Sequence, residues 1–240
     1  MKRISLLLLI FAILSFTFFI GLVFLRNPFP PYPLMSNQDA LDILTPLVLI
    51  PLYWLIFHYA GRQAPRLSQA ITFLILGVFW VEGHGMHLAA NSISNLMAEG
   101  ITRSQAELPG GDLYTLTYFY DEQLGHYLWH IGVLGLAALL IYHEWRQPAG
   151  GRTIWWQAIL GGLIYGLTLF MIINEGQTVW LGLPFSFLAV LFGLIRGRKR
   201  FGGQPVLAFF FVTFLVALLL LAGWGLYWGG FPEFGEVGLI

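Results

Sequence analysis

The sequence predicts an all-α, polytopic integral membrane protein that forms a bundle of seven transmembrane helices. Hydrophobic residues make up 58% of the 240 residues and charged residues only 10%, whereas soluble domains carry about 25% charged residues. A bilayer core of about 30 Å requires roughly 20 apolar residues per helix. Seven segments reach that length without a soluble domain between them, so we expect one membrane domain, 1–240.

The expected spans are 4–25, 43–60, 68–97, 113–142, 154–173, 178–195 and 205–228. The first span follows Lys2 and Arg3. Its apolar run is longer than the roughly 7–15 residues of a secretory signal core, so we expect a retained anchor.

Basic residues concentrate in alternate loops, which orients the bundle. One side carries Lys2, Arg3, Arg62, Arg66, Arg146, Arg152, Arg196, Arg198, Lys199 and Arg200, and the other carries Arg26 and Arg103. Cytoplasmic loops carry the excess of Lys and Arg. We therefore expect a cytoplasmic N-terminus and an outside C-terminus, with the cell (plasma) membrane as the expected location.

Net charge and cysteine content exclude several classes of function. The formal net charge is zero, whereas nucleic-acid binders usually show a basic patch, so we expect no nucleic-acid partner. The chain has no cysteine. Disulfides, thiolate catalysis and sulfur-ligated metal sites are therefore excluded.

Two outside loops and one glycine motif bear on the packing of the bundle. Prolines between Asn27 and Pro33 forbid helix in the loop 26–42, and the other sizeable outside loop is 98–112. We expect both loops to cover an outward-facing cavity. Gly162 and Gly166 form a Gly-x-x-x-Gly spacing that permits close helix contact, either within the bundle or in a homo-oligomer.

The third span carries a polar stripe. Charged groups inside a bilayer cost several kcal/mol unless they pair, line water or hold a metal, so they are functional candidates by default. Positions three and four apart share a helical face, which aligns His84, His87, Asn91 and either Ser94 or Asn95. Glu82 precedes this stripe, and Gly83 and Gly85 are expected to leave room beside it.

The fourth span carries a second stripe. Glu122, His126 and His130 repeat every four residues and share one face. Asp121 lies one step around the helix, and the spacing does not decide whether Asp121 or Glu122 faces the site. The antiparallel third and fourth spans place the two stripes at similar depths. Glu175, with Asn174, lies at the outer end of the fifth span and is expected to cap the same volume.

Imidazole and carboxylate are the ligands that zinc and non-haem iron accept when sulfur is absent. We expect the metal ligands to be His126 and His130 with His84, His87 or both, and the metal to be zinc or, alternatively, iron. The candidate catalytic carboxylates are Asp121, Glu122 and Glu82. The candidate substrate-binding residues are Asn91, Asn95 and Glu175.

The segment His126-Tyr127-Leu128-Trp129-His130, with Asp121-Glu122 before it and seven spans, resembles the membrane metal hydrolases of the alkaline ceramidase and adiponectin-receptor-like superfamily. The resemblance implies zinc held by histidines and hydrolysis of a lipid amide. In that family the His-x-x-x-His pair lies on the last helix and the metal lies towards the cytoplasm. Only the ligand chemistry of His126 and His130 is therefore carried over.

The sequence thus predicts a membrane-embedded metal-dependent hydrolase for a lipid or other hydrophobic substrate. A di-iron lipid desaturase or hydroxylase is an alternative, because His84-x-x-His87 and His126-x-x-x-His130 are spacings that such enzymes use. A proton-coupled transporter or channel is a third, because chained Asp, Glu and His residues relay protons. A haem protein with axial His87 and His126 is a fourth.

Overall fold

A computed structural model describes residues 2–30, 32–98, 110–148, 150 and 152–239. Within them, seven helical spans are long and apolar enough to cross a membrane. They are Arg3–Phe24, Asn37–Ala60, Leu67–Met97, Asp112–Arg146, Trp155–Glu175, Val179–Gly197 and Pro205–Trp228. Each coincides with an expected span, so the prediction of an all-α, seven-helix integral membrane protein is confirmed.

The elements follow one another as a chain of helices with a single hairpin near the N-terminus. They are α1 (Lys2–Phe19), the 3₁₀ segment η1 (Gly21–Phe24), β1 (Pro28–Phe29), β2 (Tyr32–Ser36), α2 (Asn37–Asp42), α3 (Leu44–Ala60), α4 (Leu67–Ala98), α5 (Asp112–Tyr118), the π-helical segment η3 (Phe119–Gly125), α6 (His126–Arg146), α7 (Trp155–Glu175), α8 (Val179–Phe192), the π-helical segment η4 (Gly193–Gly197) and α9 (Pro205–Trp228).

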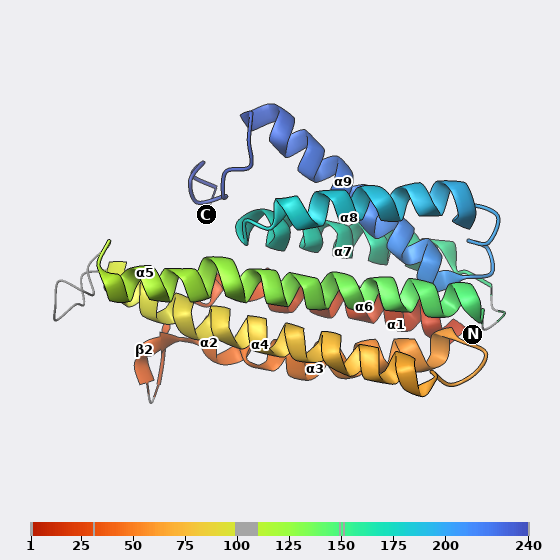
Figure 1. Cartoon of the computed structure of the whole chain (residues 1–240), viewed down its shortest axis with the longest axis horizontal. Helices are drawn as coiled ribbons and strands as arrows, with labels where there is room; N and C mark the ends of the chain where they lie inside the picture. The colour runs from red at the N-terminus through yellow and green to blue at the C-terminus, as the bar shows by residue number, and fades with distance from the viewer. Residues whose placement is uncertain (1, 31, 99–109, 149, 151, 240) are drawn as a thin grey trace.

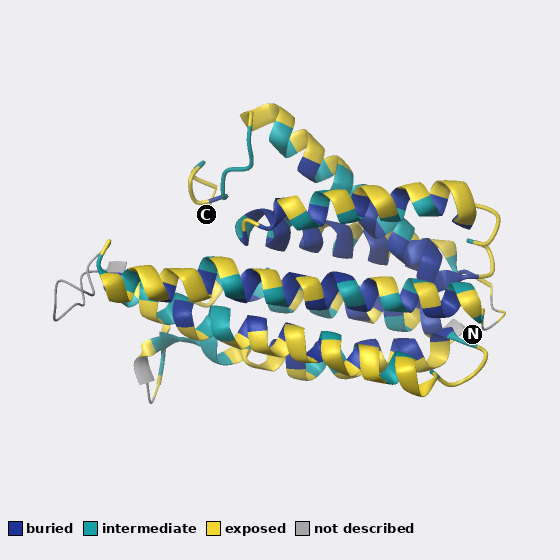
Figure 2. Ribbon diagram, viewed as in Figure 1, coloured by how far each residue is buried: buried dark blue, intermediate teal, exposed yellow. Residues whose placement is uncertain are grey.

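The long helices run along one axis, and α9 crosses the others at an angle (Figure 1). Helices α4 and α5–α6 lie side by side and extend beyond the ends of α7 and α8. Buried residues gather on the faces that the helices turn towards one another (Figure 2). The outer faces carry exposed apolar side chains such as Leu74 (64%) and Leu188 (62%), as lipid-facing positions require.

Glycines set the closest helix contacts. A methyl group on Gly83 would lie 2.3 Å from the backbone nitrogen of Trp129, and one on Gly132 would lie 2.6 Å from the backbone nitrogen of Trp80. Helices α4 and α6 therefore touch backbone to backbone. Gly85 is different, because nothing lies within 4 Å of the place its methyl group would take. Gly83 thus makes room for a neighbouring helix, whereas the space beside Gly85 stays open.

The Gly-x-x-x-Gly motif of α7 packs inside the bundle. A methyl group on Gly162 would lie 2.7 Å from Cβ of Val212, and one on Gly166 would lie 2.6 Å from the carbonyl oxygen of Thr213. Both contacts are with α9. The motif therefore holds α7 against α9, which is the first of its two expected roles.

The proline-rich loop forms a short antiparallel hairpin, in which Phe29 of β1 pairs with Tyr32 of β2. The helix then begins six residues before the expected span, at Asn37. A capping box explains this start: the Ser36 hydroxyl accepts from the Asp39 backbone N–H, and the Asp39 carboxylate accepts from the Ser36 N–H.

Most of the loop 98–112, including Arg103, is not among the described residues.

The C-terminal end of α6 is joined to the start of α9 by Glu144, which is 1% exposed. Its carboxylate oxygens accept hydrogen bonds from the backbone N–H groups of Val206 (3.2 Å) and Leu207 (2.8 Å). These are among the N–H groups of a helix start that have no acceptor within the helix. Glu144 therefore caps α9 from a neighbouring helix.

Replacing Glu144 with alanine is expected to lower the free energy of unfolding by about 1–3 kcal/mol, because Val206 and Leu207 lose their buried acceptors. Thermal unfolding of detergent-purified protein measures this change. The control is Arg198→Ala, which removes an exposed charge from the segment between η4 and α9 and is expected to leave the midpoint unchanged. Equal midpoints for all three proteins would contradict the capping role.

The predicted orientation is tested by single cysteines, since the chain has none of its own. Gln63 and Gly235 are both exposed and lie in loops at opposite ends of the bundle. A membrane-impermeant maleimide is expected to label Gly235→Cys in intact cells and Gln63→Cys only after the membrane is opened. The reverse labelling pattern would invert the topology.

Candidate metal centre

The structure brings together His87, Asp121 and His126. Each offers one ligand atom, and these atoms all lie within 4.8 Å of one another. His87 comes from α4, Asp121 from η3, and His126 is the first residue of α6. Asp121 and His126 are only 2% and 5% exposed. The chain thus holds two imidazoles and one carboxylate in a buried cluster at the contact of two helices.

Direct contacts fix the geometry of this cluster. Nδ1 of His87 lies 2.6 Å from Oδ1 of Asp121, and the ring centroids of His87 and His126 are 4.3 Å apart. A methyl group on Gly125 would lie 3.0 Å from the backbone nitrogen of His87. The bare backbone at Gly125 therefore lets α4 approach closely enough for the two imidazoles to meet.

A local change of helix type explains why Asp121 takes part. In an α-helix, residues five apart point about 140° away from each other, as 3.6 residues per turn requires. Segment η3 is π-helical, and its i→i+5 hydrogen bonds bring residues five apart close to one line. Asp121 and His126 are five apart. The wider turn therefore carries Asp121 to the face that holds His126.

Glu122 also faces the site, from a more open position. One of its carboxylate oxygens is 3.4 Å from Nδ1 of His126, and its side chain is 24% exposed. It lines the adjoining cavity. The sequence did not decide whether Asp121 or Glu122 faces the site. In the structure both do: Asp121 contacts His87 inside the cluster, and Glu122 lies at its edge.

The other two candidate histidines lie next to the cluster with partners of their own. Nε2 of His84 is 3.1 Å from the carbonyl oxygen and 3.4 Å from Oδ1 of Asp42 in α2. Nδ1 of His130 is 2.5 Å from the Thr178 hydroxyl at the start of α8. The rings of His126 and His130 lie 5.8 Å apart. The group of close ligand atoms contains His126 with His87 and Asp121, and His130 lies beside it.

Glu82 does not join the other candidates. It is exposed on α4, in line with Ile71, Ile75 and Val78, which are 47%, 52% and 56% exposed. Residues at this spacing share one helical face. Glu82 therefore continues the lipid-facing side of the helix. The apolar residues that precede it at helical spacing are the sequence pattern that indicates this placement.

A cavity of about 810 Å³ adjoins the cluster at the end of the bundle that holds η1, α2 and the segment after α9. Six of the sequence-predicted residues line it: His87, Asn91, Asn95, Glu122, His126 and Glu175. Much of the remaining wall is apolar and comes from α1, η1, α6 and α7: Phe18, Phe19, Leu22, Trp129, Met171 and Ile172. An amphiphilic molecule would find polar groups at one side and an apolar wall at the other.

The chain after α9 closes part of this cavity, a role that the sequence gave no sign of. Asn174 donates to the carbonyl oxygen of Pro232 at 2.8 Å, and Trp224 donates to the same oxygen at 3.0 Å. The backbone N–H of Phe234 donates to the Glu175 carboxylate at 3.0 Å. Glu175 thus lines the cavity and anchors the C-terminal segment.

Carboxylates dominate the charge of the cavity. Asp42, Glu122, Glu175 and Glu233 line it together with one basic residue, Arg26. Burial and the neighbouring charges of Glu122 and Glu175 raise the pKa of Glu233, which lies beyond the last span, to about 7. An excess of negative charge favours a cation at this site.

The cluster fits a metal ion by its donors and by an unsatisfied atom. Two histidines and a carboxylate form a set that zinc enzymes and non-haem iron enzymes use. Nδ1 of His126 is buried and makes no hydrogen bond among the described residues, and the Glu122 carboxylate oxygen lies 3.4 Å from it. A haem with His87 and His126 as its axial ligands does not fit, because the iron and the macrocycle would have to lie between two rings whose centroids are only 4.3 Å apart.

Comparison with known proteins gives two relatives. The chain is 27% identical over 199 residues to ceroid-lipofuscinosis neuronal protein 6 of Homo sapiens and 25% identical over 198 residues to its homolog of Canis lupus familiaris. Each match covers 77% of this chain and 61% of the relative, so the chain spans about three fifths of the length of the curated relatives. No family model and no solved structure matches. The chain is therefore a polytopic membrane protein similar to ceroid-lipofuscinosis neuronal protein 6.

Proposed function

We propose that this protein is a membrane-embedded, metal-dependent hydrolase that acts on a lipid or other hydrophobic substrate from the outer side of the membrane. The observation that carries the proposal is the buried group His87, Asp121 and His126 beside a cavity with apolar walls. We propose zinc as the metal. The cell (plasma) membrane location and the homo-oligomer remain predictions from the sequence.

The cavity suits a substrate with an apolar chain. Its volume of about 810 Å³ lies within the roughly 300–1,000 Å³ that is usual for ligand sites. Phe18, Phe19 and Leu22 offer an apolar wall, and Asn91 and Asn95 offer amide groups on the side of α4. These groups would orient a polar head towards His87 and His126.

The chemistry follows from the positions of the side chains. A zinc ion held by His87, Asp121 and His126 would lower the pKa of a bound water to about 7 and polarise a substrate carbonyl. Glu122 lies at the edge of the cluster and can take a proton from the attacking water. As the C–N or C–O bond breaks, Glu122 returns that proton to the leaving nitrogen or oxygen. The water adds OH to the acyl carbon, so the atoms balance.

The resemblance to the alkaline ceramidase and adiponectin-receptor-like superfamily bears on this proposal through His126 alone. The resemblance suggested His126 and His130 as ligands, whereas the proposed set keeps His126 and has His87 and Asp121 in place of His130. Zinc held by histidine and hydrolysis of a lipid amide, which the resemblance implies, remain proposals for this chain.

Non-haem iron oxidation chemistry is the second candidate, because one observation favours it. Two histidines and one carboxylate are the set that holds iron in non-haem oxygenases, and His87, Asp121 and His126 are such a set. Proton-coupled transport, the third expectation, would need no resident metal. Metal analysis therefore separates all three candidates.

Purified wild-type protein is expected to hold about one zinc per chain. The substitutions His87→Ala, Asp121→Ala and His126→Ala each remove a proposed ligand. Each is expected to lower zinc affinity by more than the roughly 10–100-fold that is lost when a residue hydrogen-bonded to a ligand is replaced. Elemental analysis and zinc titration measure this. His58→Ala, which removes an exposed histidine of α3, is the matched control. His130→Ala is expected to keep most of the zinc, because that ring bonds to Thr178.

Stoichiometric iron in place of zinc would move the proposal to oxidation chemistry. A correctly folded wild-type protein that holds no metal after reconstitution would refute the metal centre.

Glu122→Gln is expected to lower the rate of lipid hydrolysis by about 10²–10⁴-fold, because it removes a proton acceptor and donor, while zinc content stays near wild type. Product release from an N-acyl lipid amide and from a glycerolipid ester in proteoliposomes measures the rate. Asp112→Asn, an exposed carboxylate at the start of α5, is the control. Wild-type rates in the zinc-loaded Glu122→Gln protein would remove Glu122 from the mechanism.

A further inference from the structure

A second pocket lies at the opposite, inner end of the bundle, away from the metal cluster. Its volume is about 520 Å³. Three parts of the chain form it: the start of α4 with Arg66 and Ser68, the end of α6 with Tyr142 and Arg146, and the segment between η4 and α9 with Arg200. The metal proposal does not use any of these residues.

Positive charge defines this pocket. Arg66, Arg146 and Arg200 line it, and no aspartate or glutamate is among the residues that line it. All three arginines are exposed. In the described part of the chain no lysine or arginine forms an ion pair within 4.0 Å, since the three recorded pairs all involve histidine. The pocket therefore presents three charges that an anion can neutralise.

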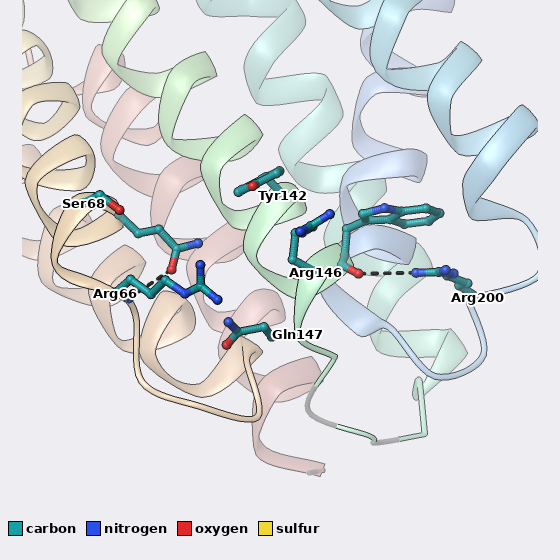
Figure 3. A pocket seen from close by; sticks show the side chains of 8 residues that line it. Arg66, Ser68, Tyr142, Arg146, Gln147 and Arg200 are labelled. Atoms are coloured by element: carbon teal, nitrogen blue, oxygen red, sulfur yellow. Dashed lines mark hydrogen bonds between the residues drawn. The ribbon is translucent and has the colours of Figure 1, made fainter.

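Arg200 is held in place rather than left to swing freely. Its guanidinium carbon lies 3.8 Å from the ring centroid of Trp145, and its NH1 donates to the Trp145 carbonyl oxygen at 3.3 Å. Figure 3 shows Arg66 and Arg200 on either side of Arg146. Because the Arg200 side chain is already ordered, binding an anion there costs less side-chain freedom.

The backbone around the pocket is also tied together. The N–H of Arg62 donates to the carbonyl oxygen of Gln147 at 2.9 Å, and Gly61 pairs with Pro148 in an isolated bridge. At the start of α4 the N–H of Arg66 donates to the Gln69 side chain at 3.0 Å. These bonds join the α3–α4 connection to the end of α6. The pocket is therefore built by the fold and is not a chance gathering of loop charges.

The chemistry of the lining suits a phosphate group. Guanidinium groups bind phosphate oxygens through paired N–H donors. Ser68, Tyr142 and Gln147 add uncharged polar side chains. The neighbouring surface of α4 is apolar, with Leu67 77% exposed and Ile71 47% exposed. A lipid phosphate would therefore meet basic and polar groups at its headgroup and an apolar surface along its acyl chains.

We propose that this inner pocket binds the phosphate group of an anionic lipid, with Arg66, Arg146 and Arg200 on the phosphate and the acyl chains along α4. Basic pockets between transmembrane helices on the cytoplasmic side are typical sites for such headgroups. A free phosphate ion presents the same chemical group as a lipid phosphate. The experiment therefore distinguishes these two ligands.

The test uses the full chain in detergent and measures binding of fluorescent phosphatidylglycerol, phosphatidylcholine and, by competition, inorganic phosphate. The pocket variant is the triple substitution Arg66→Gln, Arg146→Gln and Arg200→Gln. The matched control is Arg62→Gln, Arg198→Gln and Lys199→Gln, which removes the same charge from exposed positions that do not line the pocket.

Wild type is expected to bind phosphatidylglycerol about tenfold or more tightly than phosphatidylcholine, because each basic residue near an anionic headgroup adds to the attraction. The pocket variant is expected to lose that preference and the control to keep it. Should the triple variant not fold, Arg66→Gln and Arg146→Gln singly are each expected to weaken binding several-fold.

Competition by millimolar inorganic phosphate, with no preference between the two lipids, would support the phosphate site and assign it to a free phosphate. Equal losses in the pocket and control variants would overturn the proposal, because general surface charge would then suffice. Equal binding of both lipids without phosphate competition would also overturn it. Neither result bears on the metal centre, which lies at the other end of the bundle.

Discussion

The close backbone contact between α4 and the η3–α6 segment is the constraint on which the candidate metal centre depends. Gly83, Gly125 and Gly132 leave no room for even one added methyl group. This contact sets the 4.3 Å separation of the His87 and His126 rings. A side chain at Gly83 or Gly125 would push the helices apart. His87 and His126 would then be separated, although neither histidine is itself replaced. The glycines therefore belong to the site as much as the imidazoles do.

The seven spans were predictable because each depends only on length and hydropathy, which are local properties. The meeting of His87 and His126 was predictable for a similar reason, since both belong to polar stripes on consecutive antiparallel helices. Glu82 shows the limit of this approach. Charge alone suggested a site residue, whereas its place in line with exposed Ile75 and Val78 puts it on the lipid-facing side.

The remaining features depend on non-local geometry or on a departure from regular helix. The π-helical turn at η3 brings Asp121 to the His126 face, and no rule of α-helical spacing predicts it. Glu144 caps α9 from 62 and 63 positions away in sequence. The segment around Phe234 reaches the cavity only because it folds back onto Glu175. Each of these contacts joins parts of the chain that sequence periodicity treats separately.

Buried polar atoms without partners strengthen the case that the cluster binds something. Nδ1 of His84 and Nε2 of His130 lie beside the cluster, are buried and have no hydrogen-bond partner among the described residues. Such a group costs about 1–3 kcal/mol when it is left unsatisfied, and apolar side chains of similar size would avoid that cost. Packing alone therefore gives no reason for imidazoles here. A bound cation or polar substrate beside the carboxylates gives one, because it would accept or share the lone pairs that the protein leaves free.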